Sequence, residues 1–77
     1  MEPAETYEAR LANGEVEVAE THWGARHIVA RRVAFDDDPL NPRNVLPAEI
    51  WRRSPKLFGG RAYVETISTI ADLTTTG

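Results

Sequence analysis

Apolar and polar residues alternate over residues 6–11 and again over residues 15–18, with the dipeptide Asn13-Gly14 between the two segments. Strict alternation of this kind predicts half-buried β-strands. Asn-Gly is the strongest short hairpin signal, because both residues tolerate the positive φ of a type I′ turn. We therefore predict a β-hairpin with a two-residue loop, which fixes the register of its strands. The pairs across this hairpin are then Ala12–Glu15, Leu11–Val16, Arg10–Glu17 and Ala9–Val18.

The pattern changes to a helical period over residues 22–35. Thr21 is the predicted N-cap, since its hydroxyl can accept a free backbone N–H of the first turn. The helix should end before the aspartates that precede Pro39, because residues before proline avoid the α region. At 100° per residue the predicted buried stripe consists of Ala25, Val29 and Val33.

This predicted helix carries more apolar surface than a small sheet can cover. Further apolar side chains flank the buried stripe on both sides, and only the arc around His27 is clearly polar. The flanking residues are Ile28 and Phe35 on one side, and Trp23, Ala30 and Ala34 on the other. The excess surface indicates additional packing partners.

The second half of the chain predicts a loop, a short helix and a strand. Residues 36–43 are rich in Asp, Asn and Pro, which is typical of a loop. Pro47 suits the first position of a short helix over residues 47–53. Residues 61–73 are rich in β-branched and aromatic residues and predict a strand, in which Val64 and Ile67 are out of phase, so it contains a bulge or consists of two short strands. The fold class is therefore α+β, in the order β-β-α-α-β, with the last strand beside the hairpin and the long helix across one sheet face.

Length and composition predict one small domain. The chain has 77 residues, and we expect a single domain over residues 1–77 with flexible ends at residues 1–5 and 74–77. It has no cysteine, so no disulfide can compensate for a small core. The net charge of −3 is mild and lacks the basic surplus of a typical nucleic-acid binder. No signal peptide or apolar membrane span is evident, so a cytoplasmic location is the default expectation.

No catalytic or metal-binding pattern stands out. His22 and His27 are five positions apart, which places them about 140° apart on a helix rather than on one face. The Gly59-Gly60 pair lacks the lysine and helix of a phosphate-binding loop. The three aspartates after the long helix do not have EF-hand spacing. We therefore expect no enzyme, no cofactor and no metal.

Charged residues leave two binding hypotheses open. Arginines next to tryptophans suit nucleic acid, because phosphates pair with guanidinium groups and bases stack on aromatic rings. The arginines concerned are Arg26, Arg31, Arg32, Arg52 and Arg53. Carboxylates can instead form an acidic surface that is steered towards a basic partner. The predicted acidic partner-binding residues are Glu15, Glu17, Glu20, Asp36, Asp37 and Asp38.

Surplus apolar residues predict a homodimer. A chain of this size is marginally stable and gains from a second subunit. Aromatic residues are common anchors of protein interfaces, although the same side chains can also fill the core beneath the short helix. The residues predicted for the dimer interface are Ile28, Phe35, Trp51 and Phe58.

The segment TYEARLANGEVEVAETHWGARHIVARRVAF, residues 6–35, resembles a design found in small phage and mobile-element proteins. In that design a short antiparallel hairpin leads into an Ala- and Arg-rich helix and a strand returns. In length, element order and composition, the whole chain resembles type I anti-CRISPR proteins, including type I-C inhibitors.

The resemblance implies a non-enzymatic protein that binds a CRISPR surveillance complex in the host cytoplasm and blocks target DNA or nuclease recruitment. Acidic surfaces of such proteins often lie against the basic DNA channel, and no functional residue carries over by motif. Two alternatives remain open. One is a small DNA-binding regulator that uses the Arg-rich helix, and the other is a phage structural accessory protein.

Overall fold

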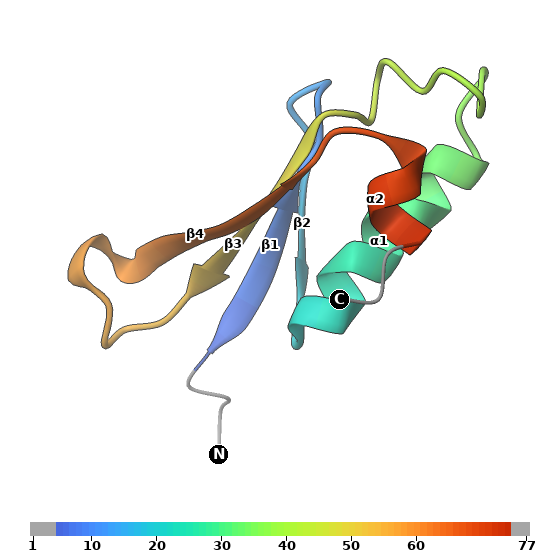
Figure 1. The fold of residues 1–77 in the computed structure, drawn as a ribbon. Coiled ribbons are helices and arrows are strands. Elements are labelled where there is room, and N and C mark those ends of the chain that lie inside the picture. Colours follow the sequence, from blue (N-terminus) through green and yellow to red (C-terminus); the bar gives the residue numbers. More distant parts are fainter. Residues whose placement is uncertain (1–4, 75–77) are drawn as a thin grey trace.

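The computed structural model describes residues 5–74 and contains one four-stranded antiparallel sheet with its helices on one side (Figure 1). The sheet order is β2-β1-β3-β4. The α+β class predicted from the sequence is confirmed. The elements are β1 (Thr6–Arg10), β2 (Val16–Ala19), α1 (His22–Ala34), β3 (Ala48–Arg53), the 3₁₀ turn η1 (Phe58–Gly60), β4 (Arg61–Ile67) and α2 (Ile70–Thr74).

The hairpin between β1 and β2 is present, but its loop has three residues rather than two. The Leu11 N–H donates to the Glu15 carbonyl at 2.8 Å, and the Gly14 N–H donates to the Leu11 carbonyl at 3.0 Å. Gly14 has φ +94°, so it sits in the left-handed region at the end of the turn. This is a turn followed by a glycine bulge, the usual geometry of three-residue loops. The Asn13 side chain supports it by accepting the Glu15 N–H at 2.9 Å.

The longer loop shifts the hairpin register by one residue, so the predicted cross-strand pairs are wrong. The observed pairs are Tyr7–Ala19, Glu8–Val18, Ala9–Glu17 and Arg10–Val16. A one-residue shift moves every side chain of β2 to the other face of the sheet. Val16 and Val18 therefore point away from α1 and are 45% and 52% exposed, whereas Glu17 lies on the side of α1 and pairs with Arg32.

Helix α1 follows the prediction closely. The Thr21 hydroxyl accepts the Gly24 N–H at 2.9 Å, which confirms Thr21 as the N-cap. Ala25, Val29 and Val33 are the buried residues of the helix, as its period predicts. The helix ends at Ala34, one residue before the predicted end, and Phe35 is the C-cap.

The short helix predicted over residues 47–53 is wrong, because this segment is the strand β3. Ala48 and Ile50 are fully buried, and the intervening Glu49 is exposed, which is the period-2 pattern of a strand. β3 pairs with β1 on one side and β4 on the other, so β4 does not lie beside the hairpin as predicted. Pro47 precedes the first residue of this strand and starts no helix.

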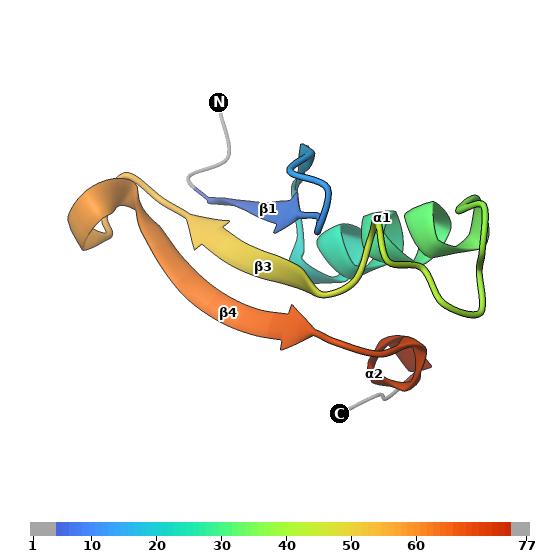
Figure 2. The same ribbon diagram turned by 90° about the horizontal axis from the view of Figure 1, so that it is seen from above.

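β4 is shorter than the strand predicted over residues 61–73. The predicted bulge is confirmed at Val64, since Ile50 pairs with Glu65 and Trp51 pairs with Tyr63. After Ile67 the chain turns into α2, which lies next to α1 in both ribbon views (Figures 1 and 2).

The core lies between α1 and one face of the sheet. The loop before β3 closes one end of this core with Val45 and Leu46, both buried. No helix covers the other face of the sheet in the described part of the chain. The buried hydrophobic residues are Ala9, Leu11, Ala25, Val29, Val33, Val45, Leu46, Ala48, Ile50 and Ile67.

Candidate functional site

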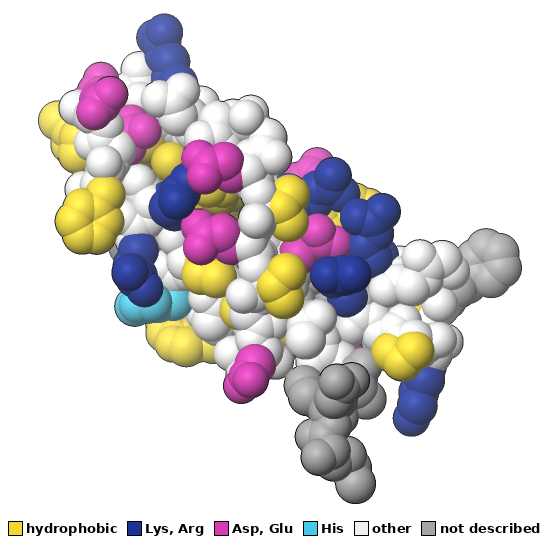
Figure 3. Space-filling view, turned by 180° about the vertical axis from the view of Figure 1, so that it is seen from behind, with side chains coloured by type: hydrophobic (Ala, Val, Ile, Leu, Met, Phe, Trp, Pro, Cys, Tyr) yellow, Lys and Arg dark blue, Asp and Glu magenta, His cyan; other side chains and the backbone are white. Residues whose placement is uncertain are grey.

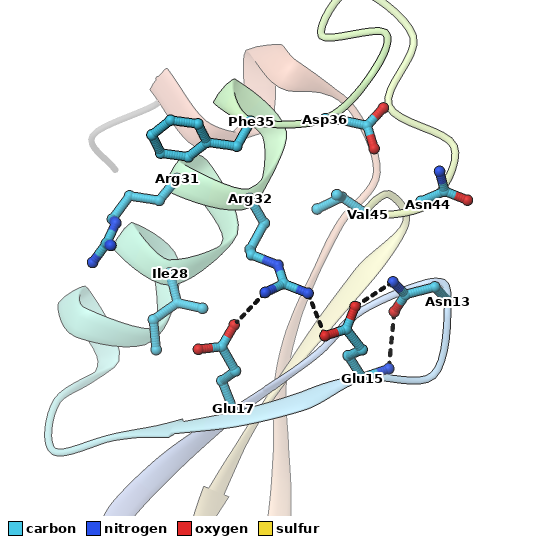
Figure 4. Close-up of a pocket in the computed structure, with 10 residues that line it drawn as sticks. All are labelled: Asn13, Glu15, Glu17, Ile28, Arg31, Arg32, Phe35, Asp36, Asn44 and Val45. Atoms are coloured by element: carbon cyan, nitrogen blue, oxygen red, sulfur yellow. Dashed lines mark hydrogen bonds and ion pairs between the residues drawn. The ribbon is translucent and has the colours of Figure 1, made fainter.

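Two surfaces bring together the residues that the sequence singled out. The first is a groove of about 480 Å³ between the hairpin, the C-terminal half of α1 and the loop that follows it (Figure 4). It is lined by Asn13, Glu15, Glu17, Ile28, Arg31, Arg32, Phe35, Asp36, Asn44 and Val45.

A bridge of charged side chains crosses this groove. The Arg32 guanidinium, which extends from α1, pairs with Glu15 and lies 3.4 Å from the Glu17 carboxylate (Figure 4). The Asn13 amide donates a further hydrogen bond to Glu15 at 2.6 Å. The hydrogen bond from Arg32, and to a smaller extent the one from Asn13, holds the pKa of Glu15 below its ordinary value. The contact with Glu15 raises the pKa of Arg32. Glu15 and Glu17 therefore tie the hairpin to the helix.

This arrangement changes the predicted acidic surface. The groove brings Glu15 and Glu17 near Asp36, but Arg32 offsets their charge. Asp36 accepts the Asp38 N–H at 3.1 Å within the loop. Asp37 and Asp38 continue along that loop and are exposed, whereas the exposed Glu20 lies at the other end of β2. The six predicted carboxylates do not form one continuous patch.

The residues predicted for a dimer interface lie on two different faces. Ile28 and Phe35 line the groove, and Phe35 is 81% exposed. Trp51 projects from β3 on the face of the sheet opposite α1. The Phe58 side chain lies outside the described part of the structure. A dimer therefore stays a prediction. Of the residues predicted for its interface, Ile28 and Phe35 lie together at the groove.

The second surface is the uncovered face of the sheet, here called the open sheet face. Its apolar centre contains Trp51 and Tyr63, whose rings meet edge to face with centroids 5.6 Å apart. Tyr63 is 54% exposed, and the indole N–H of Trp51 donates to Glu49 at 3.0 Å. The register adds two exposed valines from β2 to the same face. The apolar residues of the open sheet face are Val16, Val18, Trp51 and Tyr63.

Charged residues lie within this face as well as around it, because Glu8 and Arg10 of β1 separate the two valines of β2 from the Trp51–Tyr63 pair. Glu8 lies opposite Trp51 in the register, is almost fully buried, and has its carboxylate 3.4 Å from the Arg61 guanidinium. Arg10 pairs in register with Glu49, and both line a hollow of about 490 Å³ at one end of the face. From behind, hydrophobic, basic and acidic side chains intermix over the molecule (Figure 3). The charged residues of the open sheet face are Glu8, Arg10, Glu49, Arg53 and Arg61.

The predicted basic patch is divided among four places. Arg26 pairs with Glu65 at 2.8 Å and also donates to the Asp72 carbonyl. Arg32 occupies the groove, and Arg31 is exposed at its rim. Arg52 lies 3.5 Å from Glu5, whereas Arg53 belongs to the open sheet face. Two of the three helix arginines therefore form internal ion pairs.

His22 and Ser54, two residues with side chains common in catalytic sites, have structural contacts. The His22 ring stacks on Tyr7 with centroids 5.7 Å apart and lies 2.5 Å from the Glu65 carboxylate. Ser54 is buried, and its hydroxyl accepts the Lys56 N–H at 3.2 Å in the turn after β3. Among residues 5–74 no group of three or more His, Cys, Asp or Glu side chains could hold a metal ion.

The sequence did not predict the open sheet face, because two of the predicted elements were wrong: the two-residue hairpin loop and the short helix over residues 47–53. The two-residue loop turned Val16 and Val18 towards the core, and the short helix removed Trp51 from the sheet. A glycine at this position is compatible with a three-residue loop as well as with a two-residue loop, and the three-residue loop gives the observed register. No helix in the described residues is long and apolar enough to cross a membrane. Comparisons with protein-family models, with curated proteins and with solved structures find no match for this chain.

Proposed function

We propose that this chain is a non-enzymatic protein-binding domain and that the open sheet face is its binding surface. One observation carries this proposal: in the described part of the chain a complete face of the sheet has no covering helix and exposes Tyr63 beside Trp51, and Val16 and Val18 at its β2 edge. Exposed apolar side chains that gather on one face, together with polar residues, mark interaction sites on soluble proteins. Tyrosine, tryptophan and arginine, the residue types gathered here, dominate the binding energy of protein interfaces.

The charges of this face favour a protein partner over a nucleic acid. Glu8 and Glu49 lie among the arginines and would repel phosphate groups. Two helix arginines that could have bound DNA, Arg26 and Arg32, already pair with carboxylates of the same chain. A surface with both signs of charge suits a partner protein with a complementary pattern, which gives specificity.

The resemblance to type I anti-CRISPR proteins supplies the proposed partner. The chain binds a CRISPR surveillance complex in the cytoplasm of the host cell and blocks target DNA binding. Its action is stoichiometric, since inhibition follows from occupation of a surface.

A phage-plaquing assay tests this function in hosts that carry type I CRISPR systems, including type I-C. Expression of the chain should restore plating of a targeted phage in at least one of these hosts. Failure to restore plating in all of them would reject the CRISPR partner.

A matched pair of variants tests the surface itself. Tyr63→Ala removes an exposed ring from the open sheet face, whereas Leu40→Ala removes a 90% exposed side chain from the loop after α1. Loss of a central aromatic anchor costs on the order of 2 kcal/mol, which is roughly thirtyfold in affinity. We expect Tyr63→Ala to weaken binding to the purified complex by at least tenfold and Leu40→Ala to leave it unchanged. Equal binding by both variants would place the contact elsewhere.

A further inference from the structure

β2 is an edge strand whose outer backbone groups are available for pairing. It comes first in the sheet order and pairs only with β1. The Leu11 N–H to Glu15 carbonyl bond shows that Glu15 directs its carbonyl towards the β1 side of the hairpin. Backbone groups alternate along an antiparallel strand, so Glu17 and Ala19 also face β1. Val16 and Val18 therefore direct their N–H and C=O groups outward.

This edge carries some of the features that usually prevent strand pairing and lacks others: it is short and has the inward-pointing Glu17, but it has no lysine, proline or bulge within the strand. Proteins protect sheet edges with short strands, charged side chains (especially lysine), proline, bulges or a covering segment. β2 has the sequence VEVA, and its register with β1 is regular. In the described part of the chain, β2 packs mainly against β1 and α1. The opposite edge differs, since β4 contains the bulge at Val64.

Charge decides which register a second β2 strand can adopt. Residues opposite each other in an antiparallel pair share one face of the sheet. When two copies of β2 pair antiparallel about a two-fold axis, two registers pair at least three residues of each strand. One has its axis at Glu17 and the other at Val18. A two-fold axis at Glu17 sets Glu17 against Glu17 of the second copy, and like charges directly opposite are destabilising. An axis at Val18 sets Glu17 against Ala19 of the second copy and brings the two Val18 residues together.

We propose that a second copy of this chain binds along β2, antiparallel to it, about a two-fold axis at Val18. The two sheets then form one eight-stranded sheet. An isologous contact of this type needs no further partner, because the same edge supplies both sides. The proposal goes beyond the proposed function and does not depend on it.

In this dimer the grooves of the two copies lie next to each other, between the two α1 helices. α1 packs against β1 with β2 and β3 on either side, so three strand spacings, about 14 Å, separate the two helices. Directly packed helices lie about 8–10 Å apart, so long side chains are needed to fill the remaining space. Ile28 lines the groove, and the exposed side chains of Arg31 and Phe35 extend outward at its rim (Figure 4). The second copy thus covers the exposed Phe35 ring.

Single cysteine variants test the register directly, because the chain contains no cysteine. The two Val18 residues form a hydrogen-bonded pair, with Cα atoms about 5.5 Å apart. This separation lies within the range that a disulfide can bridge. We expect Val18→Cys to form a covalent dimer under mild oxidation. Val16→Cys is the matched control, since its two copies are four residues apart along the strands, about 13 Å.

The outcomes separate the possible arrangements. Cross-linking of Val18→Cys but not of Val16→Cys supports the proposed axis. Cross-linking only in a mixture of the two variants indicates the axis at Glu17 and overturns the proposed register. No cross-linking, together with a monomeric mass by light scattering of the unmodified chain at high micromolar concentration, overturns the dimer.

A proline variant provides a second test that keeps the fold. Val18→Pro removes an N–H that points away from β1, and proline is tolerated on edge strands at such positions. We expect a monomer with an unchanged far-ultraviolet circular dichroism spectrum. A folded variant that remains dimeric would contradict the proposal. Tyr63→Ala should dimerise like the unmodified chain, so this test is independent of partner binding.

Discussion

At the scale of single residues, contacts within the chain determine which charges remain at the surface. Sequence composition identified Glu15, Glu17 and Arg32 as charged but not as partners. The structure places Arg32 between the two carboxylates, because the shifted register turns both towards α1. Such pairs depend on tertiary geometry, so a single sequence does not predict them. The N-cap Thr21 was predictable, since its hydrogen bond is local.

A second local contact predicts a dependence of stability on pH. The Asp72 carboxylate accepts the backbone N–H groups of Ser68 and Thr69 at 2.9 and 3.1 Å. These hydrogen bonds hold the pKa of Asp72 below its ordinary value. The unfolded chain then binds a proton more readily than the folded one, so stability increases with pH. The contribution is present above the ordinary aspartate pKa, about 3.9, and is lost as pH falls through the folded value.

We expect Asp72→Asn to reduce the loss of stability in acid. The asparagine oxygen can still accept the two N–H groups, but the side chain no longer titrates. Urea unfolding of both proteins between pH 7 and pH 2, in steps, measures the difference. The unmodified chain should lose more free energy of unfolding below the ordinary aspartate pKa. Parallel pH profiles of the two proteins would show that Asp72 does not contribute.

At the scale of elements, local signals predicted α1 and the hairpin, and tertiary pairing overrode them in β3. Residues 47–53 begin with a proline and contain helix-compatible residues, which favoured a helix. In the fold, Ile50 is fully buried and the segment pairs on both sides, as a central strand does. Strand formation depends on such neighbours more than on intrinsic preference. A single sequence does not identify these neighbours.

The hairpin loop yields a prediction at this scale. Gly14 has φ +94°, and a Cβ added there would meet no atom within 4 Å. The cost of Gly14→Ala is therefore conformational, about 1–2 kcal/mol for a left-handed residue with a side chain. Gly14→Asn is the control, because asparagine visits this region more readily. In urea unfolding, the unmodified chain should have the highest free energy of unfolding, Gly14→Asn an intermediate one and Gly14→Ala the lowest. An alanine variant as stable as the unmodified chain would contradict the loop geometry.

At the scale of the whole molecule, the fold class was predictable and the arrangement of the sheet was not. Insertion of β3 between β1 and β4 widens the sheet, while α1 and α2 cover only one face (Figure 2). The open sheet face results from this insertion together with the register of the hairpin. The proposed binding surface and the proposed dimer edge both depend on that register. In the dimer, the two open sheet faces would join across the Val18 axis.

The cross-strand nuclear Overhauser effects of the hairpin test this register most directly. Residues that form a non-hydrogen-bonded antiparallel pair have Cα atoms about 4.5 Å apart, so their Hα protons give strong effects. The structure predicts such Hα–Hα contacts between Glu8 and Val18 and between Arg10 and Val16. Strong Hα–Hα effects between Ala9 and Val18 instead would indicate the register of a two-residue loop. They would turn both valines into the core and contradict the open sheet face.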